Sequence, residues 1–282
     1  MRKLSLIQKE ITSSLVKNLG LSSRESLIET KFILEYVLKK PYAQIYLDKS
    51  IDLLKNQEVD IKNIISQRLQ KKPLAYIFKE WDFYGETFCI NEHVLIPRQD
   101  TELLIDLVLN KYKREIKMNI CDLGTGSGII GITLAKHYNN SQVILCDISK
   151  EALLITQNNI NKFKLTNAKT AFSDWYHKLS KIQFDLIVSN PPYIDIDDPF
   201  LKLDELEYEP RTALFSENEG YADIEMIVNN AHNYLKEGGQ LMIEHGYNQS
   251  SQVKSIFAKA KFLSIEQHVD INSKIRVTSG LV

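Results

Sequence analysis

Apolar residues recur at helical spacing through residues 3–72. One stripe comprises Leu4, Ile7, Ile11, Leu15 and Leu19. Steps of three and four place these residues on one face of a helix. A second helical stretch follows Ser22 or Ser23, either of which can cap it, and a third spans residues 59–69. The pattern predicts a small all-helical domain over residues 1–73 with no obvious chemistry of its own.

The pattern changes between residues 74 and 97, where aromatic and β-prone residues gather. Residues 76–78 and 81–84 are rich in Tyr, Phe and Trp, which favour strands. Gly85 begins a short turn that leads into Phe88-Cys89-Ile90. We therefore expect a β-hairpin in this stretch, and residues 74–97 act as a linker between two domains.

From Met118 onward, short apolar segments alternate with helical ones. The predicted strands are 119–123, 143–147, 168–172, 184–188 and 240–244, followed by two more in the tail. The predicted helices are 101–113, 129–137, 150–163 and 219–235, with one more in the tail. Alternation of this kind builds a largely parallel, doubly wound sheet. The fold class is therefore α/β, and the second domain covers residues 98–282.

The composition narrows the range of functions. The chain has 282 residues, 44% of them hydrophobic, and a formal net charge of -1, so no global basic field exists to collect nucleic acid. The three cysteines stand far apart and form no CxxC pair or Cys/His cluster, so we expect no metal site. No apolar run reaches the ~20 residues that span a bilayer, and no signal peptide is evident. The expected compartment is the cytoplasm.

A glycine-rich loop follows the first predicted strand of the second domain. It comprises Gly124, Thr125, Gly126, Ser127 and Gly128. Glycines at this place let a ligand lie against the backbone, although an ordinary strand-to-helix turn has the same composition. Asp147 ends the second strand, 23 positions after Gly124, and its carboxylate can accept the ribose hydroxyls of an adenosine ligand. Together these residues favour a nucleotide-like cofactor.

Trp175 follows the third predicted strand, within Ser173-Asp174-Trp175. Its position at the carboxyl edge of the sheet predicts contact with the adenine of the same cofactor. The alternative is a surface loop with a stray aromatic residue, but tryptophan is seldom left without a partner on a surface.

The tetrapeptide Asn190-Pro191-Pro192-Tyr193 follows the fourth predicted strand. An –NH2 group conjugated to a carbonyl or a ring is a poor nucleophile, so an enzyme that methylates it must hold it in position. The group has two hydrogens that it can donate. The Asn190 side-chain oxygen can accept one hydrogen and the Pro191 carbonyl the other, while Pro191 and Pro192 stiffen the turn. Tyr193 can pack on the planar substrate group. The segment therefore predicts methyl transfer to an amide or amine nitrogen, by positioning rather than by a strong base, although a plain proline-rich turn would look similar.

These motifs together resemble the PrmC/HemK family, the protein-glutamine N5-methyltransferases of bacterial peptide chain release factors. The resemblance runs over nearly the whole chain. Its other motifs are Leu95-Ile96-Pro97-Arg98, Asp100-Thr101-Glu102, Tyr208-Glu209-Pro210-Arg211 and Glu244-His245-Gly246. Two positions depart from the family pattern: Gln99 stands where proline is usual, and Lys79 where glycine is common.

The resemblance implies a Rossmann-like class I methyltransferase with a seven-stranded, mostly parallel sheet, and it implies S-adenosyl-L-methionine as cofactor. The cofactor would contact Gly124 to Gly128, Asp147, Trp175 and Asn190. Residues Asn190 to Tyr193 would hold the glutamine of a Gly-Gly-Gln motif, with Asn190, Pro191 and Tyr193 catalytic. The helical domain would bind the body of the release factor.

Two other functions remain open from the residues alone. An adenine-N6 methyltransferase of DNA or RNA uses the same Asn-Pro-Pro-Tyr logic, but the neutral charge and the lack of a basic recognition domain disfavour it. A binding protein that has lost turnover is the second alternative, and the intact loop argues against it. Arg98 and Thr101 either line the site or start a helix, and residues 208–211 can form a lip around the glutamine. We interpret His245 as a structural residue rather than a catalytic one.

Overall fold

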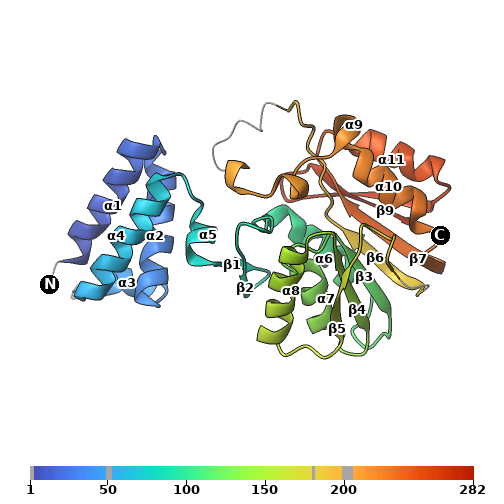
Figure 1. The fold of residues 1–282 in the computed structure, drawn as a ribbon, viewed down its shortest axis with the longest axis horizontal. Helices are drawn as coiled ribbons and strands as arrows, with labels where there is room; N and C mark the ends of the chain where they lie inside the picture. Colours follow the sequence, from blue (N-terminus) through green and yellow to red (C-terminus); the bar gives the residue numbers. More distant parts are fainter. Residues whose placement is uncertain (1–2, 49–52, 180–181, 199–205) are drawn as a thin grey trace. The chain divides into compact units, whose positions relative to one another are not determined.

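The computed structural model describes residues 3–48, 53–179, 182–198 and 206–282. The chain divides into two compact units, Met1–Lys79 and Glu80–Val282, which Figure 1 shows in blue to cyan and in cyan to red. Each unit has its own core, and each is described by itself below.

The first unit is a bundle of helices. They are α1 (Leu4–Leu19), α2 (Ser23–Leu38), α3 (Tyr42–Leu47), α4 (Lys55–Leu69) and α5 (Leu74–Phe78). Ser22 begins α2 with a capping box, in which its side chain accepts the Glu25 N–H and the Glu25 carboxylate accepts the Ser22 N–H. The predicted stripe of α1 buries Ile7, Ile11 and Leu15. Periodicity had not revealed α3, which is only six residues long.

Residues 74–78 form the helix α5, so the strand expected at Tyr76-Ile77-Phe78 was wrong. Pro73 immediately precedes the helix, where its fixed φ fits and no N–H is needed. Leu74, Ala75 and Tyr76 are buried in one helical turn, and this burial overrides the strand preference of the aromatic residues. Lys79 ends the helix in the left-handed conformation, with φ of 60°.

The second unit is built on a seven-stranded sheet in the order β5-β4-β3-β6-β7-β9-β8. The strands are β3 (Asn119–Leu123), β4 (Gln142–Asp147), β5 (Ala168–Phe172), β6 (Phe184–Ser189), β7 (Leu235–Glu244), β8 (Leu263–Val269) and β9 (Ile275–Leu281). The first five are parallel, and β9 pairs antiparallel with both β7 and β8. The predicted α/β class and seven-stranded sheet are confirmed.

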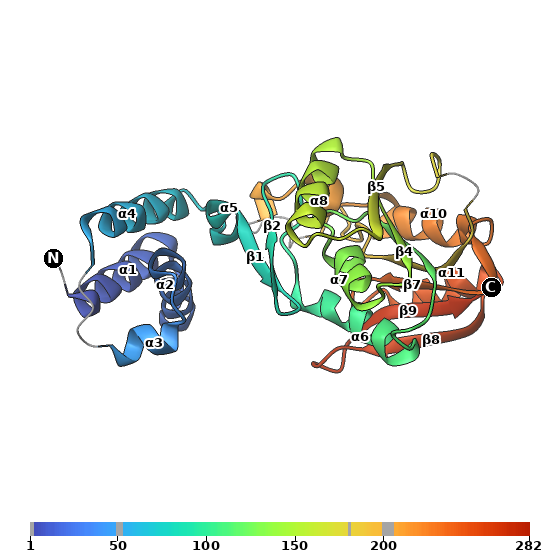
Figure 2. The same ribbon diagram turned by 90° about the horizontal axis from the view of Figure 1, so that it is seen from below.

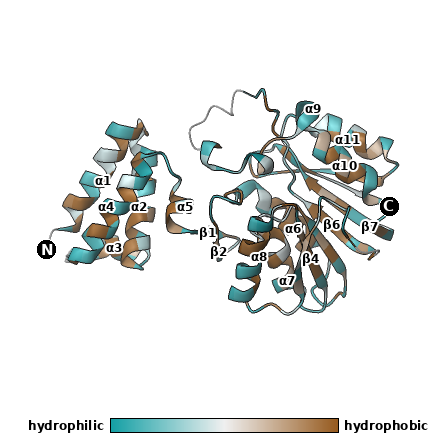
Figure 3. Cartoon of the chain, in the orientation of Figure 1, coloured by the Kyte–Doolittle hydropathy of each residue, from teal (hydrophilic) through white to brown (hydrophobic). Residues whose placement is uncertain are grey.

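Helices cover both faces of the sheet (Figures 1 and 2). One face packs against α6 (Glu102–Lys111), α7 (Ile129–His137) and α8 (Lys150–Lys162). The other packs against α10 (Ala222–Ala231) and α11 (Ser250–Lys259). Alternate residues of a strand enter opposite cores, as Ile120 and Cys121 do on β3, because strand side chains alternate between faces. Figure 3 shows the resulting hydrophobic strands between helices with mixed faces.

A hairpin of β1 (Glu80–Phe83) and β2 (Glu86–Cys89) precedes the sheet. Phe83 and Phe88 enter the core on the α6–α8 face. The Asn159 side chain of α8 accepts the Cys89 N–H at 2.7 Å and donates to the Cys89 carbonyl at 2.9 Å. The predicted hairpin is therefore present, shorter than expected, and it packs within the second unit.

The helix expected over residues 219–235 is interrupted. Asn218 and Glu219, in the short α9 (Glu217–Gly220), have left-handed backbones, and α10 ends at Ala231. A Cβ on Gly220 would lie 2.3 Å from the Tyr193 carbonyl oxygen, so the break brings the backbone against the segment that follows β6. The contact is between residues distant in sequence, which explains why periodicity missed it.

Candidate active site

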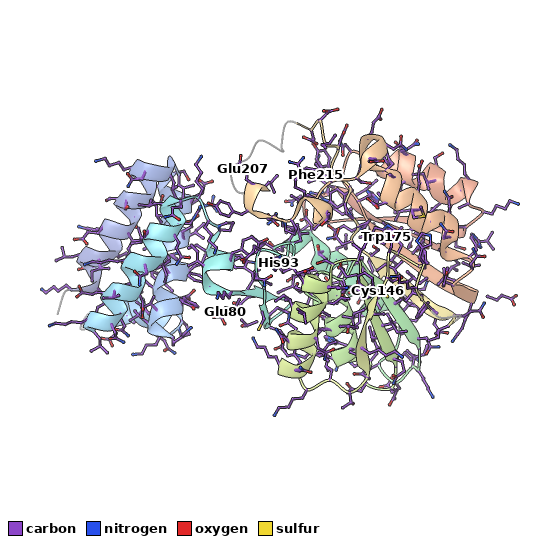
Figure 4. All side chains as sticks on the ribbon, in the orientation of Figure 1. Glu80, His93, Cys146, Trp175, Glu207 and Phe215 are labelled. Carbon is purple, nitrogen blue, oxygen red and sulfur yellow. The ribbon has the colours of Figure 1, made fainter. Side chains whose placement is uncertain are left out.

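A cavity of about 310 Å³ opens at the carboxyl ends of the parallel strands. It lies where the chain order reverses between β3 and β6, the place where open α/β sheets bind ligands. Figure 4 labels four of the residues that line it, His93, Cys146, Trp175 and Phe215. Of the residues predicted from sequence, the cavity is lined by Gly124, Thr125, Gly126, Ser127, Asp147, Trp175, Asn190 and Pro192. Gly128, Pro191 and Tyr193 are not among its lining residues.

Asp122, the fourth residue of β3, holds the glycine loop through two hydrogen bonds. Its Oδ2 accepts the Thr125 hydroxyl at 2.5 Å and the Gly131 N–H at 2.9 Å. Burial raises the pKa of Asp122 to about 6, against the lowering effect of these two hydrogen bonds. Gly126 has φ of 57°, and nothing lies within 4 Å of the place where its Cβ would stand. The loop therefore presents bare backbone to the cavity, as a closely bound ligand requires.

Asp147, at the end of β4, is fixed by backbone donors. Its Oδ2 accepts the Gly126 N–H and its Oδ1 the Ser149 N–H, each at 2.9 Å. Burial raises the pKa of Asp147, while hydrogen bonds from the backbone of Ser149, Gly126 and Ile148 oppose that shift. Each carboxylate oxygen has a further lone pair. The carboxylate therefore has spare acceptors for a pair of vicinal hydroxyl groups.

Trp175 lies over the first glycine of the loop. A Cβ on Gly124 would stand 3.3 Å from the indole ring, tighter than an ordinary van der Waals contact, so glycine lets the ring lie this close without displacement. The indole Nε1 donates to Asp223 Oδ1 on α10 at 3.1 Å, and both side chains line the cavity. Asp223 was not foreseen, because its partner is 48 positions away and no local motif marks it.

Asn190 enters the cavity from the end of β6. The strand end is tied to β3 by the Ser189 hydroxyl, which donates to the Leu123 carbonyl at 2.7 Å. The Asn190 side chain donates through Nδ2 to the Thr101 hydroxyl oxygen at 3.1 Å. Thr101 also lines the cavity. Both interpretations of Thr101 therefore hold. Thr101 lines the cavity, and it also stands immediately before α6.

Tyr193 packs against the core on the α10–α11 face of the sheet and is not among the residues that line the cavity. Its hydroxyl donates to Glu244 Oε1 at 3.4 Å, and burial raises the pKa of the phenol well above its usual range. Its backbone carbonyl accepts from Gln249 Nε2 at 3.0 Å. The predicted packing of Tyr193 on a substrate amide therefore stays a prediction, and the structure gives this side chain a second contact that sequence did not suggest.

A rim of two segments borders the cavity. Glu209 accepts an ion-paired hydrogen bond from Arg98 and another from the Ile96 N–H at 3.0 Å. These two contacts connect the motif at residues 95–98 with the motif at residues 208–211. Pro210 lines the cavity, and the Arg211 guanidinium lies 4.9 Å from the Phe215 ring centroid. Glu209 is therefore the residue that holds the two rim segments together.

His245 and Cys121 are buried in the core, and Cys146 is buried at the wall of the cavity. His245 bonds Thr278 through Nε2 at 2.8 Å, and burial lowers its pKa, which keeps it neutral in a structural position. Cys121 and Cys146 are buried with their sulfur atoms 3.8 Å apart. Within the described ranges, no cluster of three or more His, Cys, Asp or Glu residues is arranged to hold a metal ion. Of the helices that the structure describes, none has the length and hydrophobicity of a membrane span.

Known protein families match both units. The description "PrmC N-terminal domain" matches residues 12–78, and "Methyltransferase small domain" matches residues 99–202. The release factor glutamine methyltransferase of Buchnera aphidicola (subsp. Acyrthosiphon pisum) is 40% identical over 253 residues, which is 89% of this chain and 90% of that protein. The namesake in Francisella tularensis is 36% identical over 90% of this chain and 91% of its own length.

Other relatives are longer or more distant. The bifunctional methyltransferase of Rickettsia bellii is 34% identical over 96% of this chain, which spans 54% of that protein's length. A methyltransferase structure from Pyrococcus furiosus superposes with a TM-score of 0.54 at 15% identity, covering 78% of this chain and 98% of its own. The T. thermophilus 16S rRNA N2 G1207 methyltransferase gives 0.52 at 18% identity, over 72% and 49% of the two chains. These two structures share the fold of the second unit.

Proposed function

This chain belongs to the release factor glutamine methyltransferase family, and we propose that its substrate is the glutamine of a Gly-Gly-Gln motif in peptide chain release factors. It is an S-adenosyl-L-methionine-dependent methyltransferase. The predicted family, enzyme class and cofactor are therefore confirmed. The product formed from the cofactor is S-adenosyl-L-homocysteine, and the modified atom of the substrate is the side-chain amide nitrogen, N5.

The residues around the cavity fit this cofactor. Gly126 offers unobstructed backbone, and Asp147 offers a carboxylate already oriented by two backbone donors. Trp175 supplies a flat apolar surface beside them. We assign these three residues, with Gly124, Thr125, Ser127 and Asn190, to cofactor binding. When bound, the cofactor supplies an electrophilic methyl group.

The chain's own contribution to the reaction is positioning. An amide nitrogen is a weak nucleophile because its lone pair is delocalised into the carbonyl group. The Asn190 Oδ1 atom and the Pro191 carbonyl are assigned to accept its two hydrogens, which turns the lone pair toward the methyl group. Pro191 and Pro192 hold these acceptors in a stiff turn before the substrate arrives.

One observation carries the proposal. Asn190 and Pro192 line the same cavity as Asp147 and Gly126. The segment assigned to the amide group and the segment assigned to the cofactor thus meet in one space of about 310 Å³. We further propose that the helical first unit binds the body of the release factor, and that the protein works in the cytoplasm.

A transfer assay tests the proposal. The protein is incubated with methyl-labelled S-adenosylmethionine and a purified release factor, the same factor with Gln of its Gly-Gly-Gln motif changed to Asn, or duplex DNA. We expect label only in the unaltered release factor, at the glutamine N5. Label in DNA but not in the release factor would point to adenine methylation, and label in none of the three to an inactive binding protein.

A further inference from the structure

Thr101 is a buried residue with an unusual hydrogen bond. It ends the 3₁₀ helix Gln99–Thr101 and stands at the start of α6. Its side chain is fully buried, and its hydroxyl oxygen accepts the Asn190 Nδ2 hydrogen at 3.1 Å across 89 sequence positions. A threonine at a helix start ordinarily caps the helix through this hydroxyl. Here the hydroxyl makes no capping hydrogen bond, so its role lies elsewhere.

The carboxyl group of Glu244 can accept the proton of the Thr101 hydroxyl. Glu244, at the end of β7, is 1% exposed. Burial raises the pKa of the Glu244 carboxyl to about 7, and hydrogen bonds from the hydroxyls of Thr101 and Tyr193 oppose that rise. The buried Oε2 atom makes no hydrogen bond of normal geometry with any described residue, so it can accept one. When ionised, the Glu244 carboxyl only accepts hydrogen bonds, and in that form it fixes the direction in which Thr101 donates.

This direction decides which end of the Asn190 amide faces the cavity. A hydroxyl has one proton, and when Thr101 gives it to the ionised Glu244 carboxylate, it offers Asn190 only a lone pair. Only the Nδ2 end of the amide can satisfy that lone pair. The Oδ1 end is left toward the cavity, and no described residue bonds to it.

We propose that Thr101, oriented by Glu244, is a positioning residue that holds the Asn190 amide with its oxygen toward the substrate. This inference rests on the proposed function, in which Asn190 Oδ1 accepts a hydrogen from the target amide. A rotation of 180° about the last torsion of Asn190 exchanges Oδ1 and Nδ2 at almost no steric cost. After the exchange, the –NH2 group of Asn190 would face the –NH2 group of the substrate amide, and neither could accept a hydrogen bond from the other. Shape alone therefore cannot orient Asn190, and a hydrogen bond of fixed direction can.

Three variants of the full chain test this role. Thr101→Val keeps the shape and removes the hydroxyl, whereas Thr101→Ser keeps the hydroxyl. Thr133→Val is the matched control, because Thr133 is also buried but donates to the Ile129 carbonyl within its own helix. We expect kcat on the release factor to fall about 10- to 100-fold in Thr101→Val, since small misplacements cost that much. Thr101→Ser and Thr133→Val should stay within about threefold of wild type.

A second readout does not depend on the substrate. The side-chain ¹⁵N amide signal of Asn190, assigned by its loss in Asn190→Asp, reports how strongly its hydrogens are held. Their exchange with water should be faster in Thr101→Val and unchanged in Thr101→Ser. If wild type fails to methylate the release factor but shows this pattern, the proposed substrate is wrong and the positioning role stands.

Three results would overturn the inference. The first is a kcat of Thr101→Val close to that of wild type. The second is a loss in Thr101→Ser as large as that in Thr101→Val, since that would assign the effect to shape rather than to the hydroxyl. The third is an Asn190 amide whose exchange is indifferent to the removal of the Thr101 hydroxyl.

Discussion

The Asp147 carboxylate accepts the backbone N–H of Gly126 at 2.9 Å, and so joins the end of β4 to the glycine loop after β3. One side chain thus holds the loop in shape and presents its spare lone pairs to the cavity. Its roles in loop geometry and in ligand binding are therefore coupled, and the substitutions that separate them are conservative ones.

Replacing Asp147 with Asn should mainly weaken cofactor binding. The amide has only one oxygen for the two backbone donors at Gly126 and Ser149, and it has no charge. A hydrogen bond to a charged group contributes about 1.5–3 kcal/mol, so the Kd for S-adenosylhomocysteine should rise about 10- to 100-fold. Calorimetric titration measures this. Asp106→Asn, at an exposed aspartate that bonds Tyr84, is the control, and an unchanged Kd in Asp147→Asn would contradict the assignment.

Asn190→Ala should abolish turnover. The substitution removes the oxygen assigned to the target amide, and removal of one such preorganised group typically lowers kcat about 10²- to 10³-fold. Single-turnover methylation at saturating cofactor measures the chemical step separately from cofactor binding. Asn230→Ala is the control, because Asn230 is only partly buried on α10 and its side chain bonds to Met226 within the same helix. Normal single-turnover rates in Asn190→Ala would refute the amide clamp.

Much of this architecture follows from the sequence because it depends on local pattern. The strands at 119–123 and 168–172 have the bounds that alternation predicts, and the carboxyl ends of parallel strands place Asp147 and Asn190 at one edge. What the sequence did not reveal depends on contacts between distant residues. The break at Gly220 follows from the approach of the Tyr193 backbone.

The side-chain partners of the site are hidden for the same reason. Glu209 pairs with Arg98 across 111 positions, and Asp223 with Trp175 across 48. Neither spacing has a local signature, since helical and strand periodicities extend over only a few residues. Motifs can name such residues as candidates, but only the fold shows which of them meet.

Activity should fall as the pH falls through about 7. Burial raises the pKa of Glu244 to about 7, and Asp100 adds to the rise, while Thr101, Tyr193 and Arg276 oppose it. Below this pH the protonated carboxyl can donate to Thr101, which no longer fixes the direction of the Asn190 amide. The kcat of the wild-type protein should therefore fall below about pH 7. The kcat of Glu244→Gln should not fall there, because glutamine does not titrate. Identical pH profiles for the two proteins would contradict this.

The same carboxyl should cost stability at alkaline pH. A carboxyl whose pKa is raised on folding stabilises the fold below its unfolded pKa, and this contribution disappears as the pH rises through about 7. Glu244→Gln avoids the burial of charge, so its stability relative to wild type should grow from pH 5 to pH 8, by up to about 3 kcal/mol. Thermal unfolding at the two pH values measures the difference. A constant difference in Tm would show that Glu244 does not titrate in this range.

Lys79→Gly should stabilise the first unit. Lys79 ends α5 with φ of 60°, a conformation that costs a side-chain-bearing residue about 1 kcal/mol or more and that glycine adopts freely. We expect the free energy of unfolding to rise by about 0.5–1 kcal/mol, measured by urea unfolding followed through helical circular dichroism. Lys62→Gly, at an exposed position inside α4, should instead lower it by about 1 kcal/mol. Destabilisation by both substitutions would mean that Lys79 makes a contact worth more than its backbone strain.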